Sequence, residues 1–120
     1  MFNFFKKDLS GLIDMNQLYW PEVSLNWTEN WWHLVDEDEL RFGLQEELHN
    51  EIGKKHPLWG LNPVVFAKND DNVLVSLNNN KFAIVHLVWH GHIDKIPDKF
   101  PATSFFQNEI DLQRHLGYDN

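Results

Sequence analysis

The chain has 120 residues with 18 acidic and 10 basic side chains, seven histidines and no cysteine, so its formal net charge is −8. This length suits one domain, and the lack of cysteine excludes disulfides, thiolate nucleophiles and cysteine-ligated metal sites. The acidic balance argues against a nucleic-acid binder, which needs a basic surface to neutralise phosphates. No secretory signal is recognisable and no run reaches the ~20 apolar residues of a membrane span, so we expect a cytoplasmic protein with no membrane partner.

The N-terminal segment, residues 1–35, is rich in aromatic side chains. A short helix is predicted between Ser10 and Tyr19, because serine is a good N-cap and Pro21 forces the residue before it out of a helix. The stretch 22–35 has no clean period. Two interpretations of it stay open: an extended edge segment, or an irregular cover over the core.

The strongest helix signal covers residues 36–53. Asp36 followed by Glu39 is typical of a capping box, and Gly53 is a natural stop after the last helical residue. Four apolar residues recur at every fourth position and predict a buried stripe. They are Leu40, Leu44, Leu48 and Ile52.

A β-meander is predicted over residues 62–89, with strands at 63–68, 72–77 and 81–89. Clusters of Asn and Asp separate the three runs, and these residues favour tight turns. Short connections make consecutive strands antiparallel neighbours. The third run is apolar on both faces except at His86, which places it inside the sheet.

The remainder is predicted as a loop containing Pro97 and Pro101, followed by a helix over 108–117. Asn108 is its predicted N-cap and Gly117 its stop. The whole chain, residues 1–120, is therefore expected to form one α+β domain. Its core would be a three- to four-stranded antiparallel meander sheet with helices packed against it.

Three histidines and a carboxylate, in the order HLVWHGH followed by Ile-Asp, form a candidate metal site. Imidazole and carboxylate groups are ligands for zinc, iron or nickel when three of them converge. The alternative is that His86 is a hydrogen-bonded core residue while the others are solvated at the end of a strand. The candidate ligands are His86, His90, His92 and Asp94.

A second set of titratable groups lies on the acidic helix, where Glu46, Glu47 and Glu51 accompany His49. Glu51 falls within the apolar stripe, so its carboxylate must reach solvent past the end of the helix or find a buried partner, which would perturb its pKa. Lys54 and Lys55, three and four residues on, are candidates to neutralise it. The spacing is not that of a zinc protease.

Enzymatic function lacks support in the sequence. There is no Gly-x-Ser-x-Gly elbow and no glycine-rich phosphate loop, and the serines lie in no activating context. We therefore favour a non-enzymatic protein that needs no cofactor.

Charge and tryptophan are both concentrated in one part of the chain. Residues 36–51 hold seven acidic side chains and one arginine, a net −6, and four of the six tryptophans lie between positions 20 and 32. Most of these tryptophans are expected in the core or its cover, with one or two available to a partner. An apolar anchor amid carboxylates favours docking of a basic partner, whereas the alternative is a solvated helix face. The predicted partner-binding residues are Glu37, Asp38, Phe42, Glu46, His49 and Trp31.

Three short motifs carry a resemblance that covers roughly residues 40–116: HPLWG at 56–60, VHLVW at 85–89 and PAT at 101–103. Their arrangement resembles a group of small uncharacterised bacterial proteins with an HPL-x-G turn, a VHL-x-W strand and a P-x-T loop. That resemblance implies a compact α+β fold and a bacterial cytosolic protein, and brings no established activity. The group has a Ser-Gly-Lys-like tripeptide where this chain has residues 90–92, so it implies no metal site.

Two functional hypotheses emerge. The leading one is an acidic interaction protein that binds a basic macromolecular partner, of which a toxin-neutralising immunity protein is the most specific version. The alternative is a small-ligand or metal-binding protein, or an enzyme, that uses the histidines and carboxylates named above. Nothing in the sequence predicts an oligomeric state.

Overall fold

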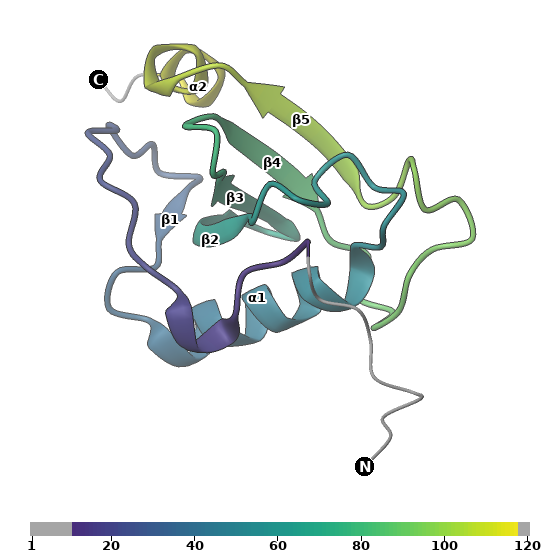
Figure 1. Cartoon of the computed structure of the whole chain (residues 1–120). Coiled ribbons are helices and arrows are strands. Elements are labelled where there is room, and N and C mark those ends of the chain that lie inside the picture. The colour runs from purple at the N-terminus through teal and green to yellow at the C-terminus, as the bar shows by residue number, and fades with distance from the viewer. Residues whose placement is uncertain (1–10, 118–120) are drawn as a thin grey trace.

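A five-stranded antiparallel sheet organises residues 11–117, the part of the chain that this computed structural model describes (Figure 1). Two α-helices and a short 3-10 turn complete the domain. In chain order the elements are η1 (Met15–Gln17), β1 (Trp32–His33), α1 (Asp38–Glu51), β2 (Val64–Asn69), β3 (Asn72–Ser76), β4 (Phe82–His86), β5 (Ala102–Phe106) and α2 (Glu109–Leu116).

The sheet follows the chain in the order β1-β2-β3-β4-β5, so every neighbouring pair is antiparallel. The two central turns use the residues that the sequence indicated. Asp70 and Asn80 both adopt positive φ, at 50° and 65°, a conformation that Asp and Asn tolerate better than most residues. The predicted meander is therefore confirmed, and β4 lies inside the sheet between β3 and β5 as expected.

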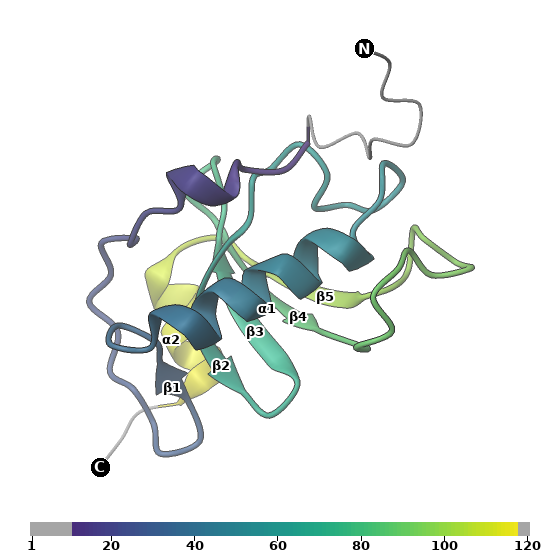
Figure 2. The same cartoon turned by 90° about the horizontal axis from the view of Figure 1, so that it is seen from below.

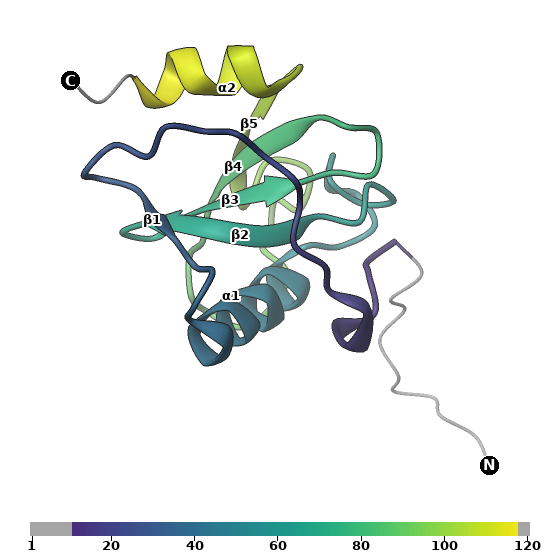
Figure 3. The same cartoon turned by 90° about the vertical axis from the view of Figure 1, so that its left-hand side faces the viewer.

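Both faces of the sheet are covered (Figure 3). Helix α1 crosses one face, where Leu44, Leu48 and Ile52 pack with Val65 and other strand residues in a first core. Helix α2 and residues 23–31 cover the opposite face (Figures 2 and 3). The second core contains Phe66, Ala67, Leu74, Phe82, Phe106 and Leu112, with Val23, Leu25, Trp27 and Trp31 packed against it.

The expected number of strands, three to four, is too low. Strand β1 at one edge pairs Trp32 with Lys68 and His33 with Ala67. Because residues 23–31 also pack on the second core, both interpretations of the segment 22–35 hold for different parts of it. Strand β5 lies in a region predicted as loop. It pairs with β4 along its whole length, from Ala102 opposite His86 to Phe106 opposite Phe82. Most of β5 is exposed, so it carries no alternating apolar pattern that would reveal a strand.

The predicted helix between Ser10 and Tyr19 is wrong in the described residues, and Ser10 itself lies outside them. The chain there forms only the turn η1, whose cap is Asp14, with Oδ1 accepting the N–H of Asn16 at 2.8 Å. No residue of η1 is buried, so tertiary packing does not stabilise a longer helix at this point.

The acidic helix begins later than predicted. Its N-cap is Glu37, which makes no side-chain capping bond, so the expected capping box at Asp36 is wrong. The N–H of Glu37 instead donates to Leu34 O at 2.9 Å, which closes a turn just before the helix. Leu40, expected in the buried stripe, is 37% exposed, whereas Leu44 and Leu48 are buried in the first core.

The C-terminal helix is confirmed together with its two boundaries. Asn108 Oδ1 accepts the N–H of Asp111 at 2.9 Å, which is the predicted N-cap bond. Gly117 ends the helix with φ 90°, in the region that favours glycine. Neither this helix nor any other in residues 11–117 is long and apolar enough to cross a membrane.

Candidate functional site

The outward side of α1 carries an exposed phenylalanine surrounded by carboxylates. Phe42 is 45% exposed, and with Asp38, Glu39 and Gly43 it lines a shallow depression of about 470 Å³. Asp38, Phe42 and Glu46 are spaced four residues apart, so they form one ridge along the helix. We call the exposed set Glu37, Asp38, Glu39, Phe42 and Glu46 the α1 acidic face.

The one arginine of α1 is directed away from this surface. Arg41 is only 6% exposed, and its Nε donates to Val65 O at 2.9 Å while its Nη2 donates to Tyr19 O. Its guanidinium also lies 3.7 Å from the ring centroid of Trp20, within cation–π range. Burial lowers the pKa of Arg41, an effect that the nearby Asp38 carboxylate partly offsets. Arg41 therefore anchors the N-terminal segment and leaves most of the acidic face without a basic neighbour on its own helix.

Two of the predicted partner-binding residues do not belong to the α1 acidic face. His49 is 6% exposed, and its Nε2 lies 3.0 Å from Gln45 Nε2 inside the domain. Trp31 is half-buried and packs against the second core, on the opposite side of the sheet from α1.

Glu51, on the apolar side of α1, holds a loop in place. The side chain is 1% exposed, and its two oxygens accept the N–H groups of Val88 and Trp89 at 2.9 and 3.0 Å. One turn earlier, Glu47 Oε2 accepts the N–H of Gly91 at 3.1 Å. The buried carboxylate thus finds backbone partners in the loop. Lys54 and Lys55, the predicted neutralising residues, are exposed just after the helix.

The two carboxyl groups also interact with each other. Burial raises the pKa of Glu51 to about 7, and a hydrogen bond and charge repulsion from Glu47 act in the same direction. The N–H donors of Val88 and Trp89 stabilise the ionised form and oppose the rise. Near neutral pH Glu51 therefore binds and releases a proton while the two carboxyl groups hold the loop through its backbone N–H groups. Such a pair of interacting carboxyl groups occurs in functional sites and in structural ones.

The histidines predicted as metal ligands lie near this loop, but they do not converge. His86 Nδ1 lies 3.0 Å from Asn72 Oδ1, at the end of β4. The rings of His90 and His92 stack with centroids 4.0 Å apart, and His90 Nε2 is 3.4 Å from Asp94 Oδ2. The pKa of Asp94 is lowered, mainly by the hydrogen bond from the backbone N–H of Ile96 and to a smaller extent by His90. Within residues 11–117 no three His, Asp or Glu side chains are placed to hold one metal ion.

His56 is a buried polar residue whose role the sequence did not indicate. It is 4% exposed, its Nδ1 accepts the N–H of Leu58 at 3.1 Å, and its Nε2 lies 2.8 Å from Pro101 O. Thr103 Oγ1 donates to the same carbonyl at 3.0 Å. The HPLWG and PAT motifs therefore meet through one imidazole, which ties the start of β5 to the turn after α1.

Comparisons with known proteins add no assignment. No family model matches the chain, and no curated protein and no solved structure matches it either. A functional assignment therefore depends on the geometry and charge of the described residues.

Proposed function

We propose that this chain is a non-enzymatic acidic interaction protein that binds a basic macromolecular partner through the α1 acidic face. The observation that carries the proposal is the orientation of Arg41: it is buried against Val65 and Tyr19, while Phe42 beside it is exposed amid carboxylates. An apolar anchor within a charged surround is typical of protein interfaces, and the charge accelerates encounter with an oppositely charged partner.

The most specific version of this proposal is an immunity protein that neutralises a basic toxin. Small acidic inhibitors of basic enzymes use charge complementarity of this kind to reach fast association. The net charge of −8 supports such a role over binding to an acidic partner. The revised binding set keeps Glu37, Asp38, Phe42 and Glu46 from the sequence prediction and omits His49 and Trp31.

The test compares two variants of equal charge in affinity capture from the native host. The first carries Glu37→Gln, Asp38→Asn, Glu46→Gln and Phe42→Ala. The control removes the same number of charges and an equally exposed phenylalanine elsewhere on the surface, where Phe105 is 43% and Phe42 45% exposed. It carries Glu29→Gln, Asp70→Asn, Asp98→Asn and Phe105→Ala.

We expect one basic protein to be captured by the wild type and by the control, and lost with the face variant. Its affinity should fall at least about tenfold in the face variant, because each interfacial anchor of this type is worth about 1–2 kcal/mol. Equal capture by both variants, or a captured protein without a basic surface, would contradict the proposal.

A further inference from the structure

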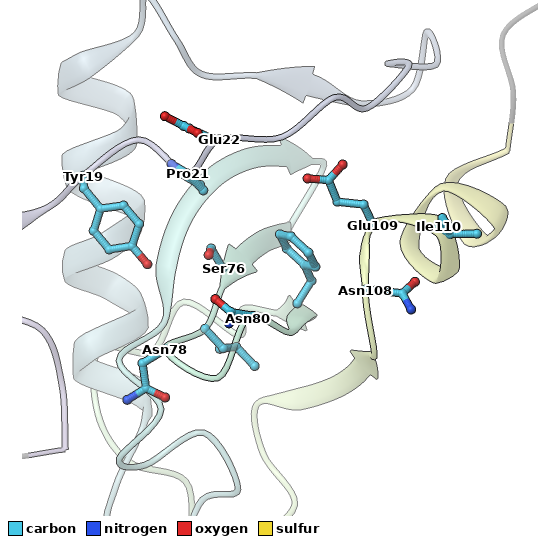
Figure 4. A pocket seen from close by; sticks show the side chains of 11 residues that line it. Tyr19, Pro21, Glu22, Ser76, Asn78, Asn80, Asn108, Glu109 and Ile110 are labelled. Carbon is cyan, nitrogen blue, oxygen red and sulfur yellow. The ribbon is translucent and has the colours of Figure 1, made fainter.

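A pocket lies away from the α1 acidic face, where three segments distant in sequence meet (Figure 4). Its volume of about 770 Å³ falls within the range of roughly 300–1,000 Å³ that is usual for ligand sites. Residues 19–22 form one wall, the β3–β4 hairpin the floor, and the start of α2 the other wall. No single segment holds enough of the pocket to be recognised from sequence.

The pocket carries negative charge. Glu22 and Glu109 contribute carboxylates, and no Lys, Arg or His of the described residues lines it. The N–H of Ser24 donates to Glu109 Oε2 at 3.3 Å, which fixes the Glu22 segment beside α2. Glu22 itself has no hydrogen bond or ion pair with another residue of the described part. A positively charged group that entered the pocket would meet two carboxylates, and the described residues that line the pocket include no basic side chain to neutralise them.

A serine hydroxyl provides an independent indication of a ligand. Ser76 is only 8% exposed, and its side chain has no hydrogen-bond partner among residues 11–117 (Figure 4). Ser76 lines the floor of the pocket. Largely buried polar groups are nearly always paired, so an unpaired one that opens into a cavity marks a place for a polar ligand atom. Tyr19 stands at the opposite wall from Glu109 and presents an aromatic ring, 42% exposed, to the same space.

We infer that this pocket receives a lysine or arginine side chain of the basic partner. The inference rests on the proposed function and adds a second contact to it. The carboxylates of Glu22 and Glu109 would accept charge-assisted hydrogen bonds, and Ser76 Oγ would accept a further N–H. The ring of Tyr19 would attract the cation through its face. The carbonyl of Tyr19 already accepts a bond from Arg41, the residue before Phe42, so one wall of the pocket is attached to the helix that carries the acidic face.

Short capped peptides test the pocket without the partner. The probes are acetyl-Ala-Arg-Ala-amide and acetyl-Ala-Lys-Ala-amide, and the neutral comparisons are acetyl-Ala-Gln-Ala-amide and methyl glucoside. Each is titrated into the ¹⁵N-labelled full chain and followed by amide chemical shifts. We expect the two cationic peptides to shift residues 19–22, 76–82 and 108–110, and the neutral probes to leave them unchanged.

Substitutions then assign the binding to the two carboxylates. Glu22→Gln with Glu109→Gln keeps an amide oxygen to accept the Ser24 N–H and should weaken both cationic peptides by about tenfold. A control of the same charge, Glu29→Gln with Asp98→Asn, should change affinity by less than about twofold because these exposed groups lie outside the pocket. Ser76→Ala should also weaken binding.

Other results would overturn the inference. They are equal binding of the neutral peptide or of the sugar, shifts located outside the pocket, or equal losses in the two charge variants. Phe42→Ala should leave peptide binding intact, because Phe42 does not line the pocket. Failure of the peptide titration and failure of the α1 capture experiment are therefore separate outcomes.

Discussion

The carboxyl group of Glu51 accepts the backbone N–H of Trp89 at 3.0 Å, joining residues 38 apart in sequence. This bond holds Trp89 at φ 63°, a left-handed conformation that is strained for a large side chain. The indole Nε1 of Trp89 adds a bond to Asp71 Oδ1 at 3.1 Å, on the turn between β2 and β3. The end of α1 and the central turn of the sheet therefore determine together where β4 stops and the following loop begins.

The first prediction concerns the alkaline side of the stability profile. Burial and Glu47 raise the pKa of Glu51 to about 7 from an ordinary 4.5, so between these pH values the folded chain binds a proton that the unfolded chain has lost. Stability from this group is complete below pH 4.5 and is lost as pH rises through 7. Urea unfolding between pH 6.5 and 9, above the range in which His56 acts, should therefore show a free energy of unfolding that decreases as the pH rises through 7.

The matched variants for this prediction are Glu47→Gln and Glu46→Gln. The first removes the facing carboxyl, should lower the pKa of Glu51 and should flatten the decrease. The second lies on the exposed side of α1 and should leave the profile unchanged. A ¹³C titration of the Glu51 carboxyl checks the assignment, and a midpoint near 4.5 in the wild type would refute it.

The second prediction concerns the acidic side. Burial lowers the pKa of His56 below its ordinary 6.5, and the bond from Leu58 N–H to Nδ1 requires an unprotonated nitrogen. Below pH 6.5 the unfolded chain therefore takes up a proton that the folded chain resists, and stability falls as the pH falls. His56→Gln should reduce this slope, whereas His86→Gln, at an exposed histidine, should not. Ring titration by NMR would contradict the prediction if His56 titrated at or above 6.5.

The fold could be predicted from sequence where local chemistry decides it. The hairpin turns at Asp70 and Asn80 and the cap at Asn108 each depend on one side chain bonding to nearby backbone or tolerating positive φ. Strand β5 depends instead on its pairing with β4 and on the contact between Pro101 and His56, 45 residues earlier. No local pattern contains that information.

Of the two candidate sites, one could be predicted from local sequence and the other could not. The carboxylates around Phe42 follow from helical spacing, so the acidic face was predictable, apart from His49, which depends on what packs around α1. The polar pocket with Glu22, Ser76 and Glu109 combines segments that only the folded chain brings together. Neither the composition nor the periodicity of any one of those segments indicates a binding site.

The third prediction uses two glycines in opposite environments. A Cβ at Gly11 would lie 2.3 Å from Cε2 of Trp59, whereas one at Gly43 would meet no atom within 4 Å. Gly11→Ala should therefore destabilise the protein by about 1–3 kcal/mol through overpacking. Gly43→Ala, inside α1, should stabilise it by about 0.5–1 kcal/mol through helix propensity. Thermal unfolding of both variants checks the pair, and equal shifts of the midpoint would contradict the contact between Gly11 and Trp59.

The fourth prediction concerns Gln45, which completes the hydrogen bonding of β2 at its start. The side chain is fully buried; its Oε1 accepts Val65 N–H at 2.7 Å and its Nε2 donates to Pro63 O at 2.7 Å. The pairing of β2 with β3 shifts between Val65 and Ala67, and the glutamine satisfies the backbone N–H of Val65 beside this irregularity. Leucine fills a similar volume but pairs with neither group.

Gln45→Leu should therefore destabilise the domain by about 2–4 kcal/mol, because two buried backbone groups lose their partners. Glu46→Leu, one residue along and exposed, serves as the control and should change stability by less than about 0.5 kcal/mol. Amide hydrogen exchange distinguishes this cause from a simple packing defect, since the Val65 N–H should lose more protection than the amides of β3 and β4. Loss of stability without selective exposure of Val65 would show that shape, and not the pair of hydrogen bonds, makes Gln45 important.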